Sequence, residues 1–229
     1  MLDTVIIIPY RAREKHLKYF LDHTAPLFKK HIPNGKIVIV EQDWNNKLFN
    51  RGCLLNIGVK EYENKTKYYI FHDVDIIPHE KCIQLLYTNT SFDVIKIYVG
   101  HDSSLGGICK FTHDSIKAVN GIPNYIWGWG IEDRALYYRY VIMKKKISPN
   151  YSNSFKFLKL QHAHNGNNTH PNNYNGINNI SNNENNIFKC NNYEKQINHI
   201  MSSGLNNLQY KIIARRQLND YVEFIKVSI

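Results

Sequence analysis

The stretch Phe71-His72-Asp73-Val74-Asp75 decides the fold class, because an apolar strand ends there in two carboxylates. The residues from Tyr68 to Phe71 have the bulky apolar side chains of a buried strand, and Ile76-Ile77-Pro78 then turns the chain away. Ligands bind at the carboxyl ends of strands in α/β sheets. Two carboxylates two residues apart can hold a divalent cation, and such a cation can neutralise a diphosphate. A chance pair of aspartates is the alternative, and neighbouring motifs decide between the two.

Further strands and helices alternate along the chain, which favours a parallel α/β sheet. Residues 193–217 are predicted as two helical pieces broken at Ser203-Gly204, and the Asn-rich residues 165–192 as a long mobile surface loop. The other expected strands cover residues 4–8, 36–41, 92–99, the stretch around 106–107, 155–160 and 221–227. The other expected helices begin near Glu14, run through residues 54–62 and 113–119, and extend from Glu132 to Lys146.

Length and composition bound the kind of protein. The 229 residues predict a single domain, 1–229, long enough to bury a sizeable core. The net charge of +10 favours a polyanionic partner or an anionic substrate such as a nucleotide, although general surface solvation explains it equally well. The four cysteines have no Cys-x-x-Cys spacing, which argues against a disulfide framework. No signal peptide or membrane-length apolar run is seen, so we expect a soluble, cytoplasmic protein. The oligomeric state stays open.

Four other groups of residues carry chemistry at expected loops and helix starts. Two arginines in Pro9-Tyr10-Arg11-Ala12-Arg13 can fork onto phosphate or uracil groups, or they are simply solvated. Phe49-Asn50-Arg51 offers an aromatic ring, an amide and a guanidinium to a base and ribose. His162-Ala163-His164 follows an expected strand and, together with carboxylates, suits Mn²⁺ or Zn²⁺. With eleven histidines in the chain, a chance His-x-His is the alternative.

The fourth group is Trp127-Gly128-Trp129-Gly130-Ile131-Glu132-Asp133. Indole rings stack on sugar faces, and glycines allow a ligand to approach the backbone closely. Adjacent carboxylates at a helix start can bind hydroxyl groups or take a proton from one. Equally, Glu132 and Asp133 can cap the helix while the tryptophans fill the core.

Taken in order, these motifs resemble the β1,4-galactosyltransferase family, glycosyltransferase family 7. The resemblance also covers Gly106-Gly107, the run from Asn120 to Asn124 and the run from Gly204 to Lys211, so it extends over most of the chain. It implies a GT-A fold, with a central mixed sheet flanked by helices. The implied activity is an inverting, Mn²⁺-dependent transfer of galactose or an N-acetylhexosamine from a UDP-sugar to a sugar or glycoconjugate hydroxyl, giving a β-linkage.

The resemblance also implies a role for each matched residue. Asp133 is the general base, and Glu132 beside it is the second catalytic residue, at a sugar-contacting position. Asp75 binds the metal, and the His162-x-His164 spacing is similar to the xylosylprotein galactosyltransferase branch, where both histidines complete the metal site. Residues at donor-contacting positions are Pro9, Tyr10, Arg11, Arg13, Phe49, Arg51, Asp73, Gly106, Gly107 and Trp129. The Asn-rich segment after the histidines is placed to act as a lid.

The chain departs from the family pattern beside both substrates. Ser104-Leu105 stands where an aromatic pair usually precedes Gly106-Gly107, so Ser104 could admit an N-acetylhexosamine. Ile131 and Arg134 differ beside the acceptor, which leaves the acceptor open, and Asn165 replaces an Asp that is common after the second histidine. A UDP- or carbohydrate-binding protein that has lost turnover is the alternative, and retention of a base argues against it. A nucleic-acid-binding module rests only on charge and ranks last, so no nucleic-acid partner is expected.

Overall fold

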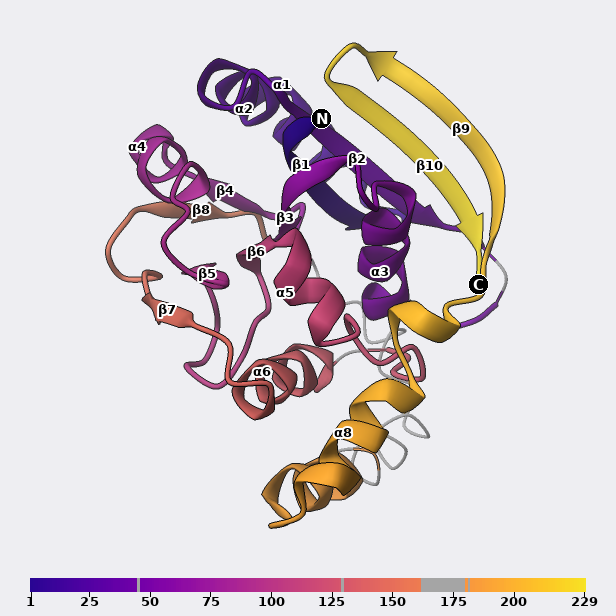
Figure 1. The fold of residues 1–229 in the computed structure, drawn as a ribbon. Helices are drawn as coiled ribbons and strands as arrows, with labels where there is room; N and C mark the ends of the chain where they lie inside the picture. Colours follow the sequence, from indigo (N-terminus) through magenta and orange to yellow (C-terminus); the bar gives the residue numbers. More distant parts are fainter. Residues whose placement is uncertain (45, 129, 162–179, 181) are drawn as a thin grey trace.

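Strand β1 (Leu2–Tyr10) runs through the middle of an eight-stranded sheet in the part of the chain that the structure describes (Figure 1). The structure is a computed structural model, and it describes residues 1–44, 46–128, 130–161, 180 and 182–229. The β-branched run Val5-Ile6-Ile7-Ile8 is fully buried, as expected for a strand with both faces covered. Parallel strands β2 (Gly35–Gln42) and β3 (Thr66–His72) flank it, so the carboxyl ends of all three lie at one edge.

The sheet is mixed, with strand order β7-β5-β6-β3-β1-β2-β10-β9. The expectation of a parallel sheet holds for its centre, whereas β6 pairs antiparallel with both β3 and β5, and β9 antiparallel with β10. Strands β4 and β8 form a separate antiparallel pair. The remaining strands are β4 (Ile76–Pro78), β5 (Val94–Tyr98), β6 (Ile108–Thr112), β7 (Ile147–Asn150), β8 (Phe157–Lys159), β9 (Lys211–Asn219) and β10 (Val222–Ser228).

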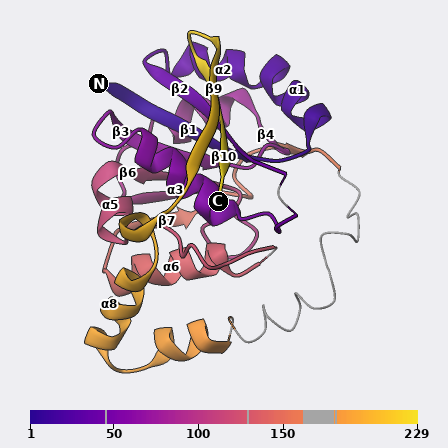
Figure 2. The same cartoon turned by 90° about the vertical axis from the view of Figure 1, so that its right-hand side faces the viewer.

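Helices cover both faces of the sheet (Figures 1 and 2). Ile6 and Ile8 of β1 share a core with Phe20 of α1 and Phe28 of α2, whereas Ile7 shares the opposite core with residues of α3, α5 and α6. Successive strand residues point to opposite faces, so one β-branched run supplies both cores. The helices are α1 (Glu14–His23), α2 (Ala25–His31), α3 (Arg51–Glu61), α4 (Glu80–Cys82), α5 (His113–Ala118), α6 (Glu132–Ile142) and α8 (Tyr193–Ser202), with a π-helical segment (Ile83–Tyr87) and a 3₁₀ turn (Leu205–Asn207).

Two predictions for the carboxyl-terminal third are wrong. The second predicted helical piece is strand β9, whose residues are all exposed at the outer edge of the sheet. The predicted loop 165–192 contains a helix over residues 182–189, held by the buried side chains of Glu184 and Phe188. The predicted helix from Glu132 to Lys146 also ends early, at Ile142. Residues 162–179 lie outside the described residues, so the lid stays a prediction.

No helix in the described part of the chain is both long and apolar enough to cross a membrane. The cytoplasmic location stays a prediction.

His72, at the end of β3, makes the stability of the fold sensitive to acid. The imidazole is completely buried against Phe20, Phe28 and Tyr87, and burial lowers its pKa to about 4. Its Nδ1 donates to the carbonyl of Asp73 at 2.9 Å, which opposes the shift, but burial dominates and the folded protein holds the neutral form. The unfolded chain has a pKa near 6.5 at this residue and takes up the proton first. Its contribution to stability is therefore complete above about pH 6.5 and is lost as the pH falls towards about 4.

We expect wild type to lose about 2 kcal/mol of unfolding free energy from this group between pH 7 and pH 5. His72→Phe, which cannot be protonated, should lose correspondingly less over the same interval, although it starts lower because a hydrogen bond is gone. Urea unfolding at both pH values measures this, and the exposed His101→Ala is the control. Equal losses in His72→Phe and wild type would contradict the account.

Candidate active site

Asn50 fixes the start of helix α3 and so places Arg51. Its side-chain oxygen accepts from the amide of Cys53 at 2.9 Å, an N-cap bond of a kind that contributes about 1 kcal/mol. Its own amide N–H donates to the Gln42 side chain at 2.8 Å, and its side-chain nitrogen donates to the Asn124 carbonyl at 2.8 Å. The cap is completely buried and tied to two other segments, so Arg51 leaves the helix from a fixed position.

Arg51 joins two carboxylates that are distant in the sequence. Its Nε donates to Asp73 at 2.9 Å, and one terminal nitrogen donates to Asp133 at 2.6 Å. Burial works to lower the pKa of Arg51, but the charges of Asp133 and Asp73 outweigh it and raise the pKa well above its ordinary value. The guanidinium is therefore a permanent cation that links the Asp-x-Asp motif to the start of α6.

The first two residues of α6 are carboxylates in different environments. Glu132 is 6% exposed, and one of its carboxylate oxygens is buried without a hydrogen-bond partner among the described residues. Burial and then the nearby charge of Asp133 raise the pKa of Glu132 well above its usual range. Burial also raises the pKa of Asp133, but Arg51 opposes that shift. Glu132 is accordingly the acid that stays protonated more readily, and Asp133 the one that ionises first.

Gly106 makes room for the Asp133 carboxylate. A Cβ atom added at Gly106 would lie 1.9 Å from Asp133 Oδ2, and the backbone dihedral angles of Gly106 do not themselves require glycine. The neighbouring backbone reinforces the contact, because the amide of Leu105 donates to the carbonyl of Asp133 at 3.0 Å. Gly107 adjoins the other side of the site, where its carbonyl accepts from the amide of Asp73 at 3.0 Å.

We expect Gly106→Ala to lower activity by about 100-fold, because the new methyl group displaces the Asp133 carboxylate from Arg51 by an ångström or more. The matched control is Gly100→Ala, since a Cβ atom there would meet nothing within 4 Å. Initial rates of the sugar transfer that the family resemblance implies, with thermal melting of both variants, measure the effect. Wild-type activity in Gly106→Ala would show that Asp133 does not depend on this space.

Asp75 lies beside Arg13 and beside the strand that leads to the histidines. Arg13 and Asp75 approach to 3.5 Å, and both side chains are partly exposed. The amide of Leu160 donates to the Asp75 carbonyl at 2.8 Å, directly after β8 pairs with β4. His162, His164 and Trp129 lie outside the described residues, so their predicted roles are untested by the geometry. Within the described residues, no group of three or more His, Cys, Asp or Glu side chains is gathered for a metal.

Arg11 and Phe49 come together next to Trp44, which the sequence analysis did not single out. The Arg11 guanidinium lies over the Trp44 ring, 5.3 Å from its centroid, and over the Phe49 ring at 5.4 Å. The Phe49 carbonyl accepts from the amide of Gly128 at 2.8 Å, which joins this loop to the tryptophan loop. Trp44 was missed because it belongs to no recognised motif. A tryptophan just after the strand expected over residues 36–41 was the available signal.

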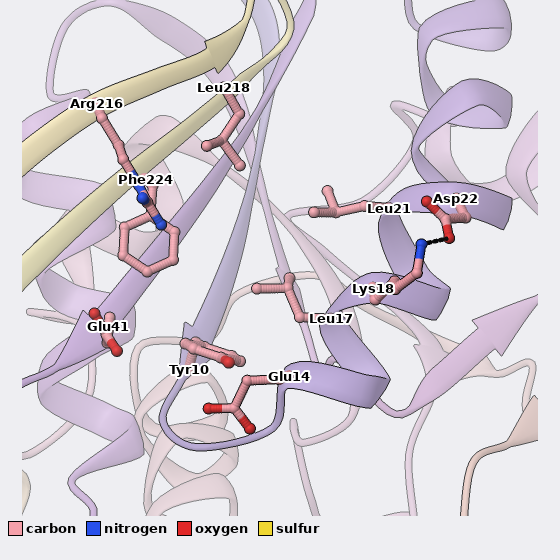
Figure 3. Close-up of a pocket in the computed structure, with 10 residues that line it drawn as sticks. All are labelled: Tyr10, Glu14, Leu17, Lys18, Leu21, Asp22, Glu41, Arg216, Leu218 and Phe224. Atoms are coloured by element: carbon pink, nitrogen blue, oxygen red, sulfur yellow. Dashed lines mark hydrogen bonds and ion pairs between the residues drawn. The ribbon is translucent and has the colours of Figure 1, made fainter.

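Tyr10 and Pro9 end β1 with their side chains buried. The Tyr10 ring packs edge-on against Phe224 of β10, with ring centroids 6.2 Å apart. It also lines a pocket of about 460 Å³ between α1 and the β9–β10 hairpin (Figure 3). Leu17 and Leu21 of α1 form one wall of this pocket and Leu218 the other.

Sequence comparison places the chain in a family of transferases. The pattern described as the N-terminal region of glycosyl transferase group 7 matches residues 2–88, and that described as the N-terminal domain of galactosyltransferase matches residues 88–162. The chain belongs to glycosyltransferase family 7. The matched ranges of this family include Arg51, Asp73 and Asp133, the three residues that the structure brings together.

Two curated members of family 7 show how far the similarity extends. β1,4-Galactosyltransferase 4 of Cricetulus griseus is 35% identical over 175 residues, which cover 71% of this chain and 49% of that protein. β1,4-Galactosyltransferase 1 of Bos taurus is 27% identical over 232 residues, covering 98% of this chain and 53% of that protein. The chain thus spans about half the length of the curated relatives it matches.

A solved family structure confirms the fold. A mutant of Drosophila β1,4-galactosyltransferase 7, in complex with manganese, UDP-galactose and xylobiose, matches with a TM-score of 0.75 and 22% identity. The match covers 100% of this chain and 94% of that one. The predicted GT-A fold, with its central mixed sheet flanked by helices, is therefore confirmed.

Proposed function

We propose that the protein is an inverting, metal-dependent glycosyltransferase that moves a hexose from a UDP-sugar to a hydroxyl group of a sugar or glycoconjugate. The observation that carries the proposal is the Arg51 bridge between Asp73 of the Asp-x-Asp motif and Asp133 at the start of α6. It joins the strand end where ligands bind in such sheets to a partly exposed carboxylate suited to act as a base. Family membership and the relatives' names as β1,4-galactosyltransferases support it.

Asp133 acts as the general base in this proposal. As the acceptor hydroxyl attacks the anomeric carbon, Asp133 removes its proton, and the bond from that carbon to the UDP oxygen breaks. Displacement from the opposite face inverts the configuration, so an α-linked donor gives a β-linked product. Glu132, the neighbouring carboxyl group at the start of α6, is the second catalytic residue in this proposal and contacts a sugar beside Asp133.

The residues present fit a divalent cation. The three carboxylates of Asp73, Asp75 and Asp133 face two guanidinium groups, those of Arg51 and Arg13, so negative charge is in excess. The carboxylate of Asp75 offers oxygen ligands and is partly exposed. The amide of Leu160 donates a hydrogen bond to the carbonyl of Asp75, and one residue separates Leu160 from His162. The chain between them is therefore short enough for His162 to reach a cation at Asp75. With imidazole ligands added, Mn²⁺ suits the set. The cation would stabilise the charge on departing UDP.

Ser104 is the residue that decides which donor sugar fits in this proposal. Its hydroxyl accepts from the amide of Gly106 at 3.2 Å, next to the space that holds Asp133. A small side chain here leaves room for a 2-acetamido group, so UDP-N-acetylhexosamines compete with UDP-galactose as donors. The acceptor is a glycan or glycoconjugate.

The test is UDP release from UDP-galactose, UDP-glucose, UDP-GalNAc and UDP-GlcNAc, with Mn²⁺, in the presence of mixed β-linked glycan acceptors. We expect turnover of one or more donors, and a large anomeric proton coupling in the product, which identifies a β-linkage. The matched variant Ser104→Tyr should lose any N-acetylhexosamine transfer while it keeps galactose transfer. An α-linked product would exclude the inverting mechanism, and UDP binding without turnover of any donor would favour a binding protein.

A further inference from the structure

Trp44 is an exposed aromatic side chain at the edge of the proposed donor site. It stands just beyond the carboxyl end of β2, and 72% of its surface is exposed. A large apolar ring in this position is not explained by packing, since it belongs to neither core of the sheet. Exposed aromatic rings next to a ligand site commonly supply a flat surface for stacking.

The group that lies over the Trp44 ring is a cation, the Arg11 guanidinium. The Arg11 guanidinium lies 5.3 Å from the centroid of Trp44, and no carboxylate of the described residues lies within ion-pair distance of it. Arg11 donates instead to the carbonyl of Lys47 at 2.9 Å, in the same loop as Trp44. Phe49 presents a second ring to the guanidinium at 5.4 Å. A planar cation therefore occupies a place bounded by two aromatic rings.

We propose that Trp44 stacks on the uracil base of the UDP-sugar, opposite to or beside Phe49. This inference rests on the proposed function. A nucleobase is planar and has an apolar face, which matches the exposed face of Trp44, and the diphosphate on the ribose of the same ligand offers an anion to Arg11. A UDP-sugar thus accounts for both the exposed Trp44 ring and the Arg11 guanidinium beside it. Stacking on a base contributes enough that removing the ring weakens binding about 5- to 100-fold.

The test separates the base from the diphosphate. Calorimetry with Mn²⁺ compares UDP, UMP and inorganic pyrophosphate as ligands of wild type, Trp44→Ala and Trp44→Phe. We expect Trp44→Ala to bind UDP and UMP about 10-fold more weakly and to bind pyrophosphate as wild type does. Trp44→Phe keeps a flat ring and should stay within about 3-fold of wild type for all three ligands. Tyr193→Ala, which removes an aromatic ring that is 58% exposed at the start of α8, is the matched control and should change nothing.

Two results would overturn the assignment of Trp44 alone. Equal UDP affinity in wild type and Trp44→Ala would show that the ring does not touch the base. An equal loss of UDP and pyrophosphate affinity would show that Trp44 acts by shaping the loop. Failure of wild type to bind UDP at all would overturn the proposed function instead, and this inference with it.

Discussion

Replacing Asp133 with Asn is expected to lower sugar transfer about 1,000-fold, because the amide cannot accept the proton of the attacking hydroxyl. The substitution keeps the size of the side chain and an oxygen that can accept from Arg51 at the present distance of 2.6 Å. UDP affinity should therefore stay within about threefold of wild type, since the loss lies in the chemical step and not in ground-state binding. Initial rates and calorimetry on the same preparation measure both quantities.

The pH dependence of Asp133 gives an independent check on its role. Burial raises the pKa of this carboxyl, so it becomes protonated at a higher pH than an ordinary aspartate. The base must be ionised to act, so kcat/KM should rise with pH on the acid side and level off above the raised pKa. Asp220→Asn, in the exposed turn between β9 and β10, is the control for a lost carboxylate and should keep the wild-type rate and profile. Substantial activity in Asp133→Asn would exclude Asp133 as the base.

Replacing Asp75 with Asn is expected to have the second-largest effect, a loss of activity of at least about 100-fold. A metal that stabilises departing UDP contributes several kcal/mol to the transition state, and each 1.36 kcal/mol lost lowers the rate tenfold. The amide removes one negative charge from the metal site, so Mn²⁺ binding in the presence of UDP should weaken as well. Titration of free Mn²⁺ by electron paramagnetic resonance measures that affinity directly.

The Asp73→Asn variant distinguishes the roles of the two carboxylates of the Asp-x-Asp motif. Asp73 bonds to Arg51 at 2.9 Å, whereas Asp75 faces Arg13 at 3.5 Å. We expect Asp73→Asn to raise the KM for the donor while Mn²⁺ is still required at a similar concentration. If Asp73→Asn and Asp75→Asn lost Mn²⁺ affinity equally, the assignment of the metal to Asp75 and not to Asp73 would be wrong.

The central strands and the carboxylates at their ends could be predicted because local pattern and tertiary role coincide there. Val5-Ile6-Ile7-Ile8 is β-branched and continuous, as a strand covered on both faces must be, and the structure buries it completely. The Asp-x-Asp motif directly follows β3, at the edge of the sheet where ligands bind. Family resemblance gave Arg51 and Asp133 separate roles, but it did not predict their ion pair, because residues 82 positions apart share no local signal.

The carboxyl-terminal elements could not be read from local pattern, for two different reasons. Strand β9 is exposed along its whole length, so it lacks the alternation of buried and exposed residues that identifies a strand. The helix over residues 182–189 lies in an asparagine-rich segment, whose composition predicts a loop. Distant contacts hold this helix, because Glu184 accepts a hydrogen bond from Tyr125 and is hydrogen-bonded to His199 at 2.7 Å. Neither partner can be inferred from the sequence around Glu184. Tertiary contacts outweigh local propensity in both elements.

Calorimetric titration of the wild-type protein with UDP, with Mn²⁺ and with chelator, tests the central claim most directly because it needs no knowledge of the acceptor. The account predicts saturable binding of UDP with Mn²⁺ that weakens at least about 10-fold when the metal is removed, because a cation held by Asp75 would neutralise the diphosphate. The same affinity for UDP with and without Mn²⁺ would contradict the metal site. No binding of UDP under either condition would contradict the assignment of this chain as a UDP-sugar transferase.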